Sequence, residues 1–217
     1  MNCVGVGPDG RQARFASLGP ISGDAMDGAP AAGLAAVAAA VRSEDGRSAK
    51  TELEQLVPAH FGLETPVELA RSVHAGTIPW RRLGELAPLV FEAADTDAVA
   101  AEIVDRQAAE VVAFVRAALH RLDLAGDEVE VILGGGVLQA GHTRLLDGIE
   151  VGLREVGSRL LVRVARSRPI VGSALLGLDR LGATPDAHAR AREELDRATD
   201  ALGGDVTGDT AAVAELP

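Results

Sequence analysis

Val131-Ile132-Leu133-Gly134-Gly135-Gly136-Val137-Leu138 is the stretch that decides the fold of this 217-residue chain. It follows Glu128-Val129-Glu130, so polar and apolar residues first alternate and then give way to an apolar run. This pattern is typical of a half-buried strand that enters the interior of a sheet. The three glycines end the strand abruptly, and a helix is expected after them.

Downstream of the glycines the chain alternates between helical and extended patterns. A helix is expected over about Thr143–Val156, a strand over Leu160–Val164, and an apolar helix from Pro169 through Leu181. From Val129 onward the order is strand, helix, strand, helix. That order is typical of an α/β fold.

Upstream, the first residues read as a hairpin. Cys3, Val4 and Val6 form a short apolar run, the turn Pro8-Asp9-Gly10 follows, and Ala13-Arg14-Phe15 resumes the extended pattern. The clearest helix runs from about Asp97 to Leu122, with apolar residues recurring at three- and four-residue spacing. It is long enough to cross a whole domain.

Between the hairpin and this long helix the sequence predicts a polar loop and several helices. The segment Gly19–Gly28 is too rich in glycine and aspartate for a regular element, and the alanine-rich run Gly33–Arg42 is expected to be helical. Short helices are expected over Thr51–Phe61, Thr65–His74 and Trp80–Ala94. These would pack as a small all-helical insert covering about residues 48–95.

Beyond about residue 183 the composition changes. Asp186–Leu202 fits a charged helix, and Gly203–Pro217 is small, polar and acidic. The sequence therefore predicts one main domain over 1–183, followed by a charged helix and a disordered tail over 184–217.

Charge and composition exclude several classes of function. The chain carries 32 acidic and 21 basic residues, with Lys50 its only lysine, and it has no tyrosine. Binding to nucleic acid or to an anionic membrane surface is therefore not expected. The apolar stretches are too short to cross a bilayer, no secretion signal is visible, and the single cysteine, Cys3, excludes a disulfide framework. A cytoplasmic location is expected.

The glycine run Gly134–Gly136 is the first candidate binding site. A backbone without side chains can approach a flat or anionic ligand closely and offer it amide hydrogens. The alternative is a tight connection between strand and helix with no ligand, and spacing alone does not separate the two. The run matches neither a Walker loop nor the full dinucleotide fingerprint.

Asp24 is the second candidate. Its carboxylate lies beside flexible glycines in Ile21-Ser22-Gly23-Asp24, where it would be able to meet a hydroxylated ligand or hydrated magnesium. The alternative, which the residues favour, is an aspartate that stabilises a turn. The five histidines are scattered without metal-ligand spacing, and Ser173 and Cys3 are expected to be small packed residues, so neither a metal site nor a catalytic residue is assigned.

Five motifs taken together carry a resemblance to a known family. They are Asn2-Cys3-Val4-Gly5-Val6, Gly19-Pro20-Ile21-Ser22-Gly23-Asp24, Pro58-Ala59-His60-Phe61-Gly62-Leu63, Glu85-Leu86-Ala87-Pro88-Leu89-Val90-Phe91 and Leu133-Gly134-Gly135-Gly136-Val137-Leu138. In this order and spacing the chain, over about residues 2–183, resembles the BadF/BadG/BcrA/BcrD-type ATPases. That family includes the N-acetylglucosamine kinases and belongs to the actin, sugar kinase and heat-shock chaperone superfamily.

The resemblance implies a ribonuclease H-like, actin-like ATPase fold, of which this chain would be the C-terminal lobe with its helical insert. It implies ATP and Mg as cofactors. Asn2 and Asp24 would hydrogen-bond an amino sugar, Gly134, Gly135 and Gly136 would form the adenosine loop, and Gly84 would lie in a wall of the adenine pocket. The family's first phosphate loop and catalytic aspartate would precede Met1. After Gly-Asp the family usually has a bulky or acidic residue followed by small ones, often glycine, and in this chain Ala25-Met26-Asp27 depart from that pattern.

The expected function is therefore that of the nucleotide-binding lobe of an ATP-dependent sugar kinase, poorly active alone and completed by a separate N-terminal lobe or by a homodimer. The alternative is a non-catalytic binding or assembly module that keeps the lobe fold. A third reading, an activator ATPase of the same broad family, needs cysteines that hold an iron–sulfur cluster across a dimer, and one cysteine does not resemble that arrangement.

Overall fold

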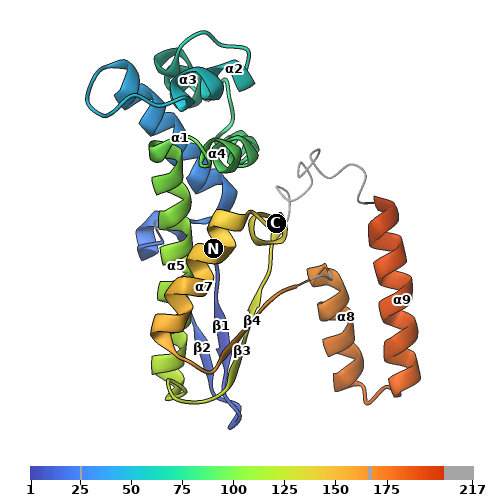
Figure 1. Cartoon of the computed structure of the whole chain (residues 1–217). Coiled ribbons are helices and arrows are strands. Elements are labelled where there is room, and N and C mark those ends of the chain that lie inside the picture. The colour runs from blue at the N-terminus through green and yellow to red at the C-terminus, as the bar shows by residue number, and fades with distance from the viewer. Residues whose placement is uncertain (25, 166–167, 203–217) are drawn as a thin grey trace. The chain divides into compact units, whose positions relative to one another are not determined.

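A computed structural model describes residues 1–24, 26–165 and 168–202, and the tail predicted to be disordered lies outside these residues (Figure 1). Contacts divide the chain into two compact units, residues 1–164 and 165–217. The boundary predicted from the sequence, after residue 183, stays a prediction. The fold is mixed α/β and mostly helical.

The first unit opens with the expected hairpin. Strands β1 (Val4–Val6) and β2 (Gln12–Arg14) pair antiparallel, with Gly5 opposite Ala13. Gly5 also lets the hairpin approach the helix behind it, because a Cβ added there would stand 2.8 Å from Leu122 Cδ1.

The predicted strand–helix–strand order is confirmed at the other end of this unit. Strand β3 (Val129–Leu133) pairs in parallel with β4 (Leu160–Val164), and α6 (Gly136–Gln139) and α7 (Thr143–Val156) connect them. The sequence predicted a helix after the glycines with the range of α7 alone, so the separate short helix α6 was not predicted. The hairpin and the parallel pair are two separate two-stranded sheets.

The loop expected over Gly19–Gly28 contains a regular turn. A 3₁₀ helix, η1, spans Gly19–Ser22, with Pro20 in its first turn, and ends at Gly23 in the left-handed region. Proline supplies the helical φ angle and glycine accepts the positive φ, so one turn forms despite the loop-like composition. Helix α1 (Gly28–Glu44) follows and begins earlier than the alanine run suggested.

The helical insert contains α2 (Leu53–His60), α3 (Pro66–His74), η2 (Trp80–Leu86) and α4 (Ala87–Ala93). The single helix expected over Trp80–Ala94 is broken between Leu86 and Ala87. Pro88 explains the break, because proline has no amide hydrogen to continue an existing helix but is tolerated in the first turn of a new one.

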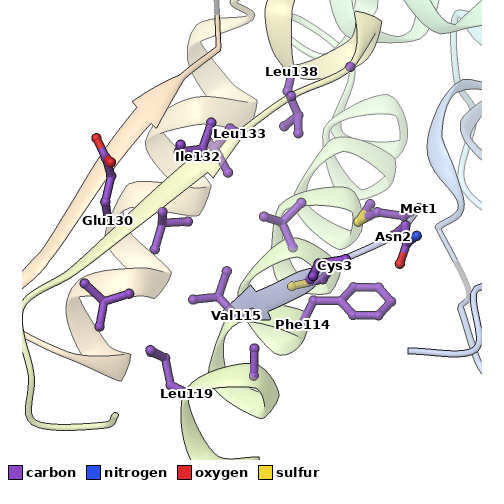
Figure 2. A pocket seen from close by; sticks show the side chains of 18 of the residues that line it. Met1, Asn2, Cys3, Phe114, Val115, Leu119, Glu130, Ile132, Leu133 and Leu138 are labelled. Carbon is purple, nitrogen blue, oxygen red and sulfur yellow. The ribbon is translucent and has the colours of Figure 1, made fainter. Parts of the chain in front are cut away.

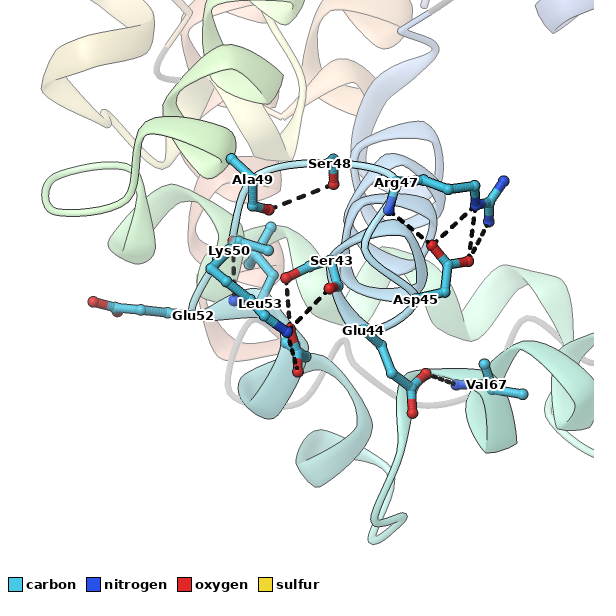
Figure 3. A network of polar contacts seen from close by, with 12 residues as sticks. Ser43, Glu44, Asp45, Arg47, Ser48, Ala49, Lys50, Glu52, Leu53 and Val67 are labelled. Atoms are coloured by element: carbon cyan, nitrogen blue, oxygen red, sulfur yellow. Dashed lines mark hydrogen bonds and ion pairs between the residues drawn. The ribbon is translucent and has the colours of Figure 1, made fainter.

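A polar network joins the end of α1 to α2 and α3 (Figure 3). The buried Ser43 hydroxyl donates to Glu54 Oε2 at 2.5 Å, and Lys50 Nζ donates to the Ser43 carbonyl and to the same carboxylate. Glu44 accepts the amide of Val67 at 3.2 Å. Lys50, the only lysine, therefore ties the end of α1 to α2 of the insert.

Helix α5 (Ala98–Leu122) confirms the predicted long helix and runs from the insert to the hairpin (Figure 1). Asp97 caps its first turn by accepting the amides of Val99 and Ala100. Its apolar face packs on α7, α4, α1 and the hairpin, so α5 forms the centre of the core.

In the second unit α8 (Pro169–Arg180) packs against α9 (Pro185–Leu202). His188 connects them, with Nε2 2.8 Å from Asp179 Oδ1 and Nδ1 2.9 Å from the Thr184 carbonyl. Within the described ranges, no helix combines the length and the apolar character that crossing a membrane requires.

Candidate functional site

A cavity of about 570 Å³ lies between β1 and β3, and we call it the cleft (Figure 2). The residues of both strands line it. Helix α5 forms an apolar floor with Val111, Phe114, Val115, Ala118, Leu119 and Leu122. Its volume lies within the range of about 300–1,000 Å³ that is typical of small-molecule sites.

The cleft brings together four of the six predicted site residues. Asn2, at the start of β1, and the three glycines Gly134–Gly136, at the end of β3, all line it. They are far apart in the sequence and meet because β1 packs on α5 and β3 borders the same cavity. We call Gly134–Gly136 the glycine loop.

The glycine loop is open toward solvent or ligand. Gly135 has a φ of +99°, a conformation that side-chain-bearing residues rarely adopt. A Cβ added at Gly135 or Gly136 would meet no atom within 4 Å. The amides of these two glycines donate to no described residue.

Asn2 is exposed and held in place by a neighbouring loop. Its Oδ1 accepts a hydrogen bond from the Ser17 hydroxyl at 2.8 Å. The amide nitrogen of the side chain keeps two donors for another partner.

Asp24 is buried and does not line the cleft. The Ser22 hydroxyl lies 2.6 Å from its Oδ2, and its own amide donates to the Gly19 carbonyl at 3.1 Å. These contacts hold the 3₁₀ turn together, which is the structural role that the residues favoured. The next residue, Ala25, lies outside the described residues.

Asp24 nevertheless acts electrostatically on the end of the cleft. The amino group of Met1, which lines the cleft, forms an ion pair with Asp27. Burial lowers the pKa of this amino group, while the negative charges of Asp24 and Glu110 oppose that effect. The negative charge of Asp24 therefore acts on the Met1 amino group at the end of the cleft.

Gly84 lies outside the cleft. Its nearest neighbours are Ala29 and Pro30 at the start of α1, each 3.6 Å from the position of an added Cβ. Ala29 itself lines the cleft. The structure therefore places Gly84 one residue behind the wall, where it affects the cleft through the packing of α1.

Gln107 is a polar residue of the cleft that the sequence analysis missed. Its side chain is 2% exposed, and Nε2 donates to the Met26 carbonyl at 3.0 Å. Its Oε1 is buried and has no partner among the described residues. Gln107 follows Ile103 and precedes Val111 at four-residue spacing, so a polar residue on the apolar face of α5 was the available signal.

Cys3 also lines the cleft, half-buried beside β1. Burial raises the pKa of its thiol. The thiol therefore stays protonated near neutral pH and is a poor nucleophile, in keeping with the packing role predicted for it.

The charges around the cleft restrict the ligands it can hold. Glu130 lines it, and no lysine or arginine of the described residues does. No group of three His, Cys, Asp or Glu side chains in the described part of the chain is arranged to hold a metal ion. The cleft thus suits an uncharged, partly apolar group better than a polyanion.

No model of a known protein family matches this chain, and no curated protein matches it.

Proposed function

We propose that this chain is the nucleotide-binding C-terminal lobe of an ATP-dependent sugar kinase of the N-acetylglucosamine kinase type. The observation that carries the proposal is the meeting of Asn2 and the glycine loop in one cleft of suitable size. The resemblance assigns a sugar contact to Asn2 and an adenosine contact to the glycine loop.

The order of elements supports the ribonuclease H-like part of the proposal. An antiparallel hairpin, a long helix and a parallel strand–helix–strand unit follow one another along the chain. In the proposed fold the two small sheets belong to one larger sheet. In this structure they are separate.

The chemistry of the cleft fits the adenosine part of ATP. An adenine ring needs a flat apolar space and a few hydrogen-bonding groups, and the free amides of Gly135 and Gly136 beside apolar side chains supply both. The triphosphate would find no lysine or arginine among the described residues that line the cleft. Its charge would have to be neutralised by Mg and by a partner lobe.

On the sugar side, Asn2 offers its side-chain amide as a donor. The resemblance also assigns Asp24 to the sugar, but its carboxylate is buried outside the cleft. Amide and carboxylate groups are the usual partners of sugar hydroxyls. No catalytic residue is assigned to this chain. Magnesium would supply charge neutralisation at the phosphates, with phosphate oxygens and water as its main ligands.

Isothermal titration with adenosine and with ATP in the presence of Mg tests this proposal. Because no cationic side chain of the described residues lines the cleft to neutralise the phosphates, the two affinities should agree within about tenfold, with little dependence on salt. ATP binding much tighter than adenosine binding, or no adenosine binding at all, would contradict the proposal. The chain alone should not phosphorylate N-acetylglucosamine.

A second candidate function is a binding or assembly module without catalysis. The observation that favours it is the pair of unpaired strand edges facing each other across the cleft. Such edges are templates for pairing with another chain.

A further inference from the structure

The two strands that border the cleft each have one partner and one open edge. Among the described residues, β1 pairs only with β2, and β3 pairs only with β4. The open edges of β1 and β3 both border the cleft. Unpaired backbone groups at such edges favour the addition of a strand.

The register of the hairpin shows which groups of β1 face the cleft. The Gly7 amide donates to the Arg11 carbonyl at 2.9 Å, and Gly5 lies opposite Ala13 two residues along. Antiparallel pairs alternate between bonded and non-bonded positions, so Gly5 bonds to β2. Val4 and Val6 therefore turn their amide and carbonyl groups toward the cleft.

The register of the parallel pair shows which backbone groups of β3 face the cleft. The Val129 amide donates to the Arg159 carbonyl at 3.2 Å, so Val129, and with it Val131 and Leu133, direct their backbone groups toward β4. Glu130 and Ile132 direct theirs into the cleft. No hydrogen bond within the described residues uses these backbone groups of Val4, Val6, Glu130 or Ile132.

The directions of β1 and β3 and the apolar floor of the cleft determine how an added strand would lie. β1 and β3 run in opposite directions (Figure 2), so a strand between them would be antiparallel to one and parallel to the other. Beneath it lies the apolar face of α5, where Val115 and Leu119 point into the cleft. A strand directs backbone groups to both sides and alternate side chains to one face.

We propose that the cleft accepts one extended strand from another polypeptide, hydrogen-bonded to β1 on one side and β3 on the other. Its alternate residues are apolar and pack on α5. The strand joins the hairpin and the parallel pair into one five-stranded sheet. A small apolar ligand would fill the floor but leave both rows of backbone groups unpaired, and this favours a strand as the occupant.

A fluorescein-labelled heptapeptide, Lys-Val-Thr-Val-Thr-Val-Lys with blocked ends, is a suitable probe. Fluorescence anisotropy should show saturable binding to the intact chain. Two control peptides carry N-methyl groups on the valines or on the threonines, which removes the amide donors along one edge only. Each should bind about tenfold more weakly or worse, because hydrogen bonds to one strand are lost. Equal binding of all three peptides would overturn the proposal.

Matched variants of the chain test the same contacts by changing the protein instead of the peptide. Val6→Pro removes a donor that faces the cleft, at an edge position where proline is tolerated, and should weaken peptide binding about tenfold. Val6→Thr keeps the amide and changes the side chain comparably, so its binding should equal that of the unaltered chain. Equal binding by Val6→Pro, with an unchanged melting curve, would count against the strand site.

Hydrogen exchange tests the same backbone contacts on the unaltered chain. The peptide should slow amide exchange at Val4, Val6, Glu130 and Ile132, while amides of α9 should be unaffected. Binding without protection at these four positions would overturn the proposal. A chain that forms dimers by itself and becomes monomeric on Val6→Pro would support the strand site, with a second copy supplying the strand.

The strand and the adenosine are both assigned to the cleft, so the peptide and adenosine should compete for it, and each is titrated in the absence of the other. Adenosine titration tests the loop at the carboxyl end of β3, whereas the peptide tests the edges of the strands. Val6→Pro should change peptide binding without changing adenosine binding. The two proposals can therefore fail separately.

Discussion

The Thr51 hydroxyl donates to Asp97 Oδ2 at 2.6 Å and joins the start of α2 to the start of α5. The Glu52 amide donates to the same oxygen at 2.6 Å, and the other oxygen accepts two amides of the first turn of α5. Asp97 is buried, so one carboxylate satisfies four donors and fixes the insert on the central helix.

Asp97→Asn should therefore destabilise the first unit by about 2 kcal/mol, because the new amide group is a donor where Thr51 and Glu52 also donate. Urea denaturation of this variant against the unaltered chain measures the effect. Asp95→Asn, at an exposed position two residues earlier, is the control and should change stability by less than about 0.5 kcal/mol. Equal stability of the two variants would show that the hydrogen bonds of Asp97 contribute nothing to the free energy of unfolding.

Asp97 should also make stability depend on acid pH. Burial opposes its ionisation, but hydrogen bonds from Thr51, Ala100, Glu52 and Val99 outweigh it and hold the pKa below its usual value. A lowered folded pKa stabilises the fold above the unfolded pKa of about 3.9, and this contribution disappears as pH falls through the folded value. The acid limb of a stability–pH curve should be shallower for Asp97→Asn. An unchanged acid limb in Asp97→Asn would show that other groups cause the loss of stability at low pH.

Gly33 allows the closest approach between α1 and η2. A Cβ added there would stand 1.9 Å from the Leu83 carbonyl oxygen, too close for any side chain without movement of the backbone. Gly33→Ala should cost about 1–3 kcal/mol of the free energy of unfolding. Gly126→Ala, where an added Cβ meets no atom within 4 Å, is the control and should be nearly neutral. A neutral Gly33→Ala would mean that α1 and η2 pack less closely than described.

Much of the fold was predictable because local patterns determine it. The hairpin, α5, α7 and both parallel strands follow the expected periodicities closely. The break before α4 was missed although Pro88 signals it, because the apolar spacing continues across it. One turn of 3₁₀ helix in a glycine-rich segment leaves no periodic signal at all.

The candidate site was predictable only in part. Spacing identified the glycine loop, but the open edges of β1 and β3 depend on how two distant sheets lie against α5, and no local pattern contains that information. Gln107 shows the same difficulty. A glutamine on an apolar face signals a buried polar group, yet the unpaired Oε1 becomes apparent only when the neighbouring carbonyl of Met26 is placed.

His188 should titrate above the usual histidine range. Its hydrogen bond to the Thr184 carbonyl and its contact with Asp179 raise the pKa against the opposing effect of desolvation. A raised folded pKa stabilises the packing of α8 on α9 below about pH 6.5, and this contribution is lost as pH rises through the folded value.

An NMR titration of the imidazole shifts measures this pKa directly. Asp179→Asn should lower the pKa of His188, because the carboxylate no longer favours the charged ring. Glu194→Gln removes a carboxylate from the same helix, one that is not paired with His188, and should leave the titration almost unchanged. The same pKa in all three chains would exclude Asp179 as a cause.

The last prediction separates backbone strain from ligand contact in the glycine loop. Gly135→Ala places a side chain at a φ of +99°, so it should lower stability by about 1–2 kcal/mol with or without ligand. Gly136 has no positive φ, and an added Cβ there meets no atom within 4 Å, so Gly136→Ala should leave the free energy of unfolding unchanged within about 0.5 kcal/mol. If adenosine lies against this backbone, the methyl group of Gly136→Ala occupies space the ligand needs, and titration should show about tenfold weaker binding. Unchanged adenosine affinity in a stable Gly136→Ala chain would show that the nucleotide does not bind at the loop. A loss of adenosine affinity in Gly135→Ala alone would show that backbone strain causes it.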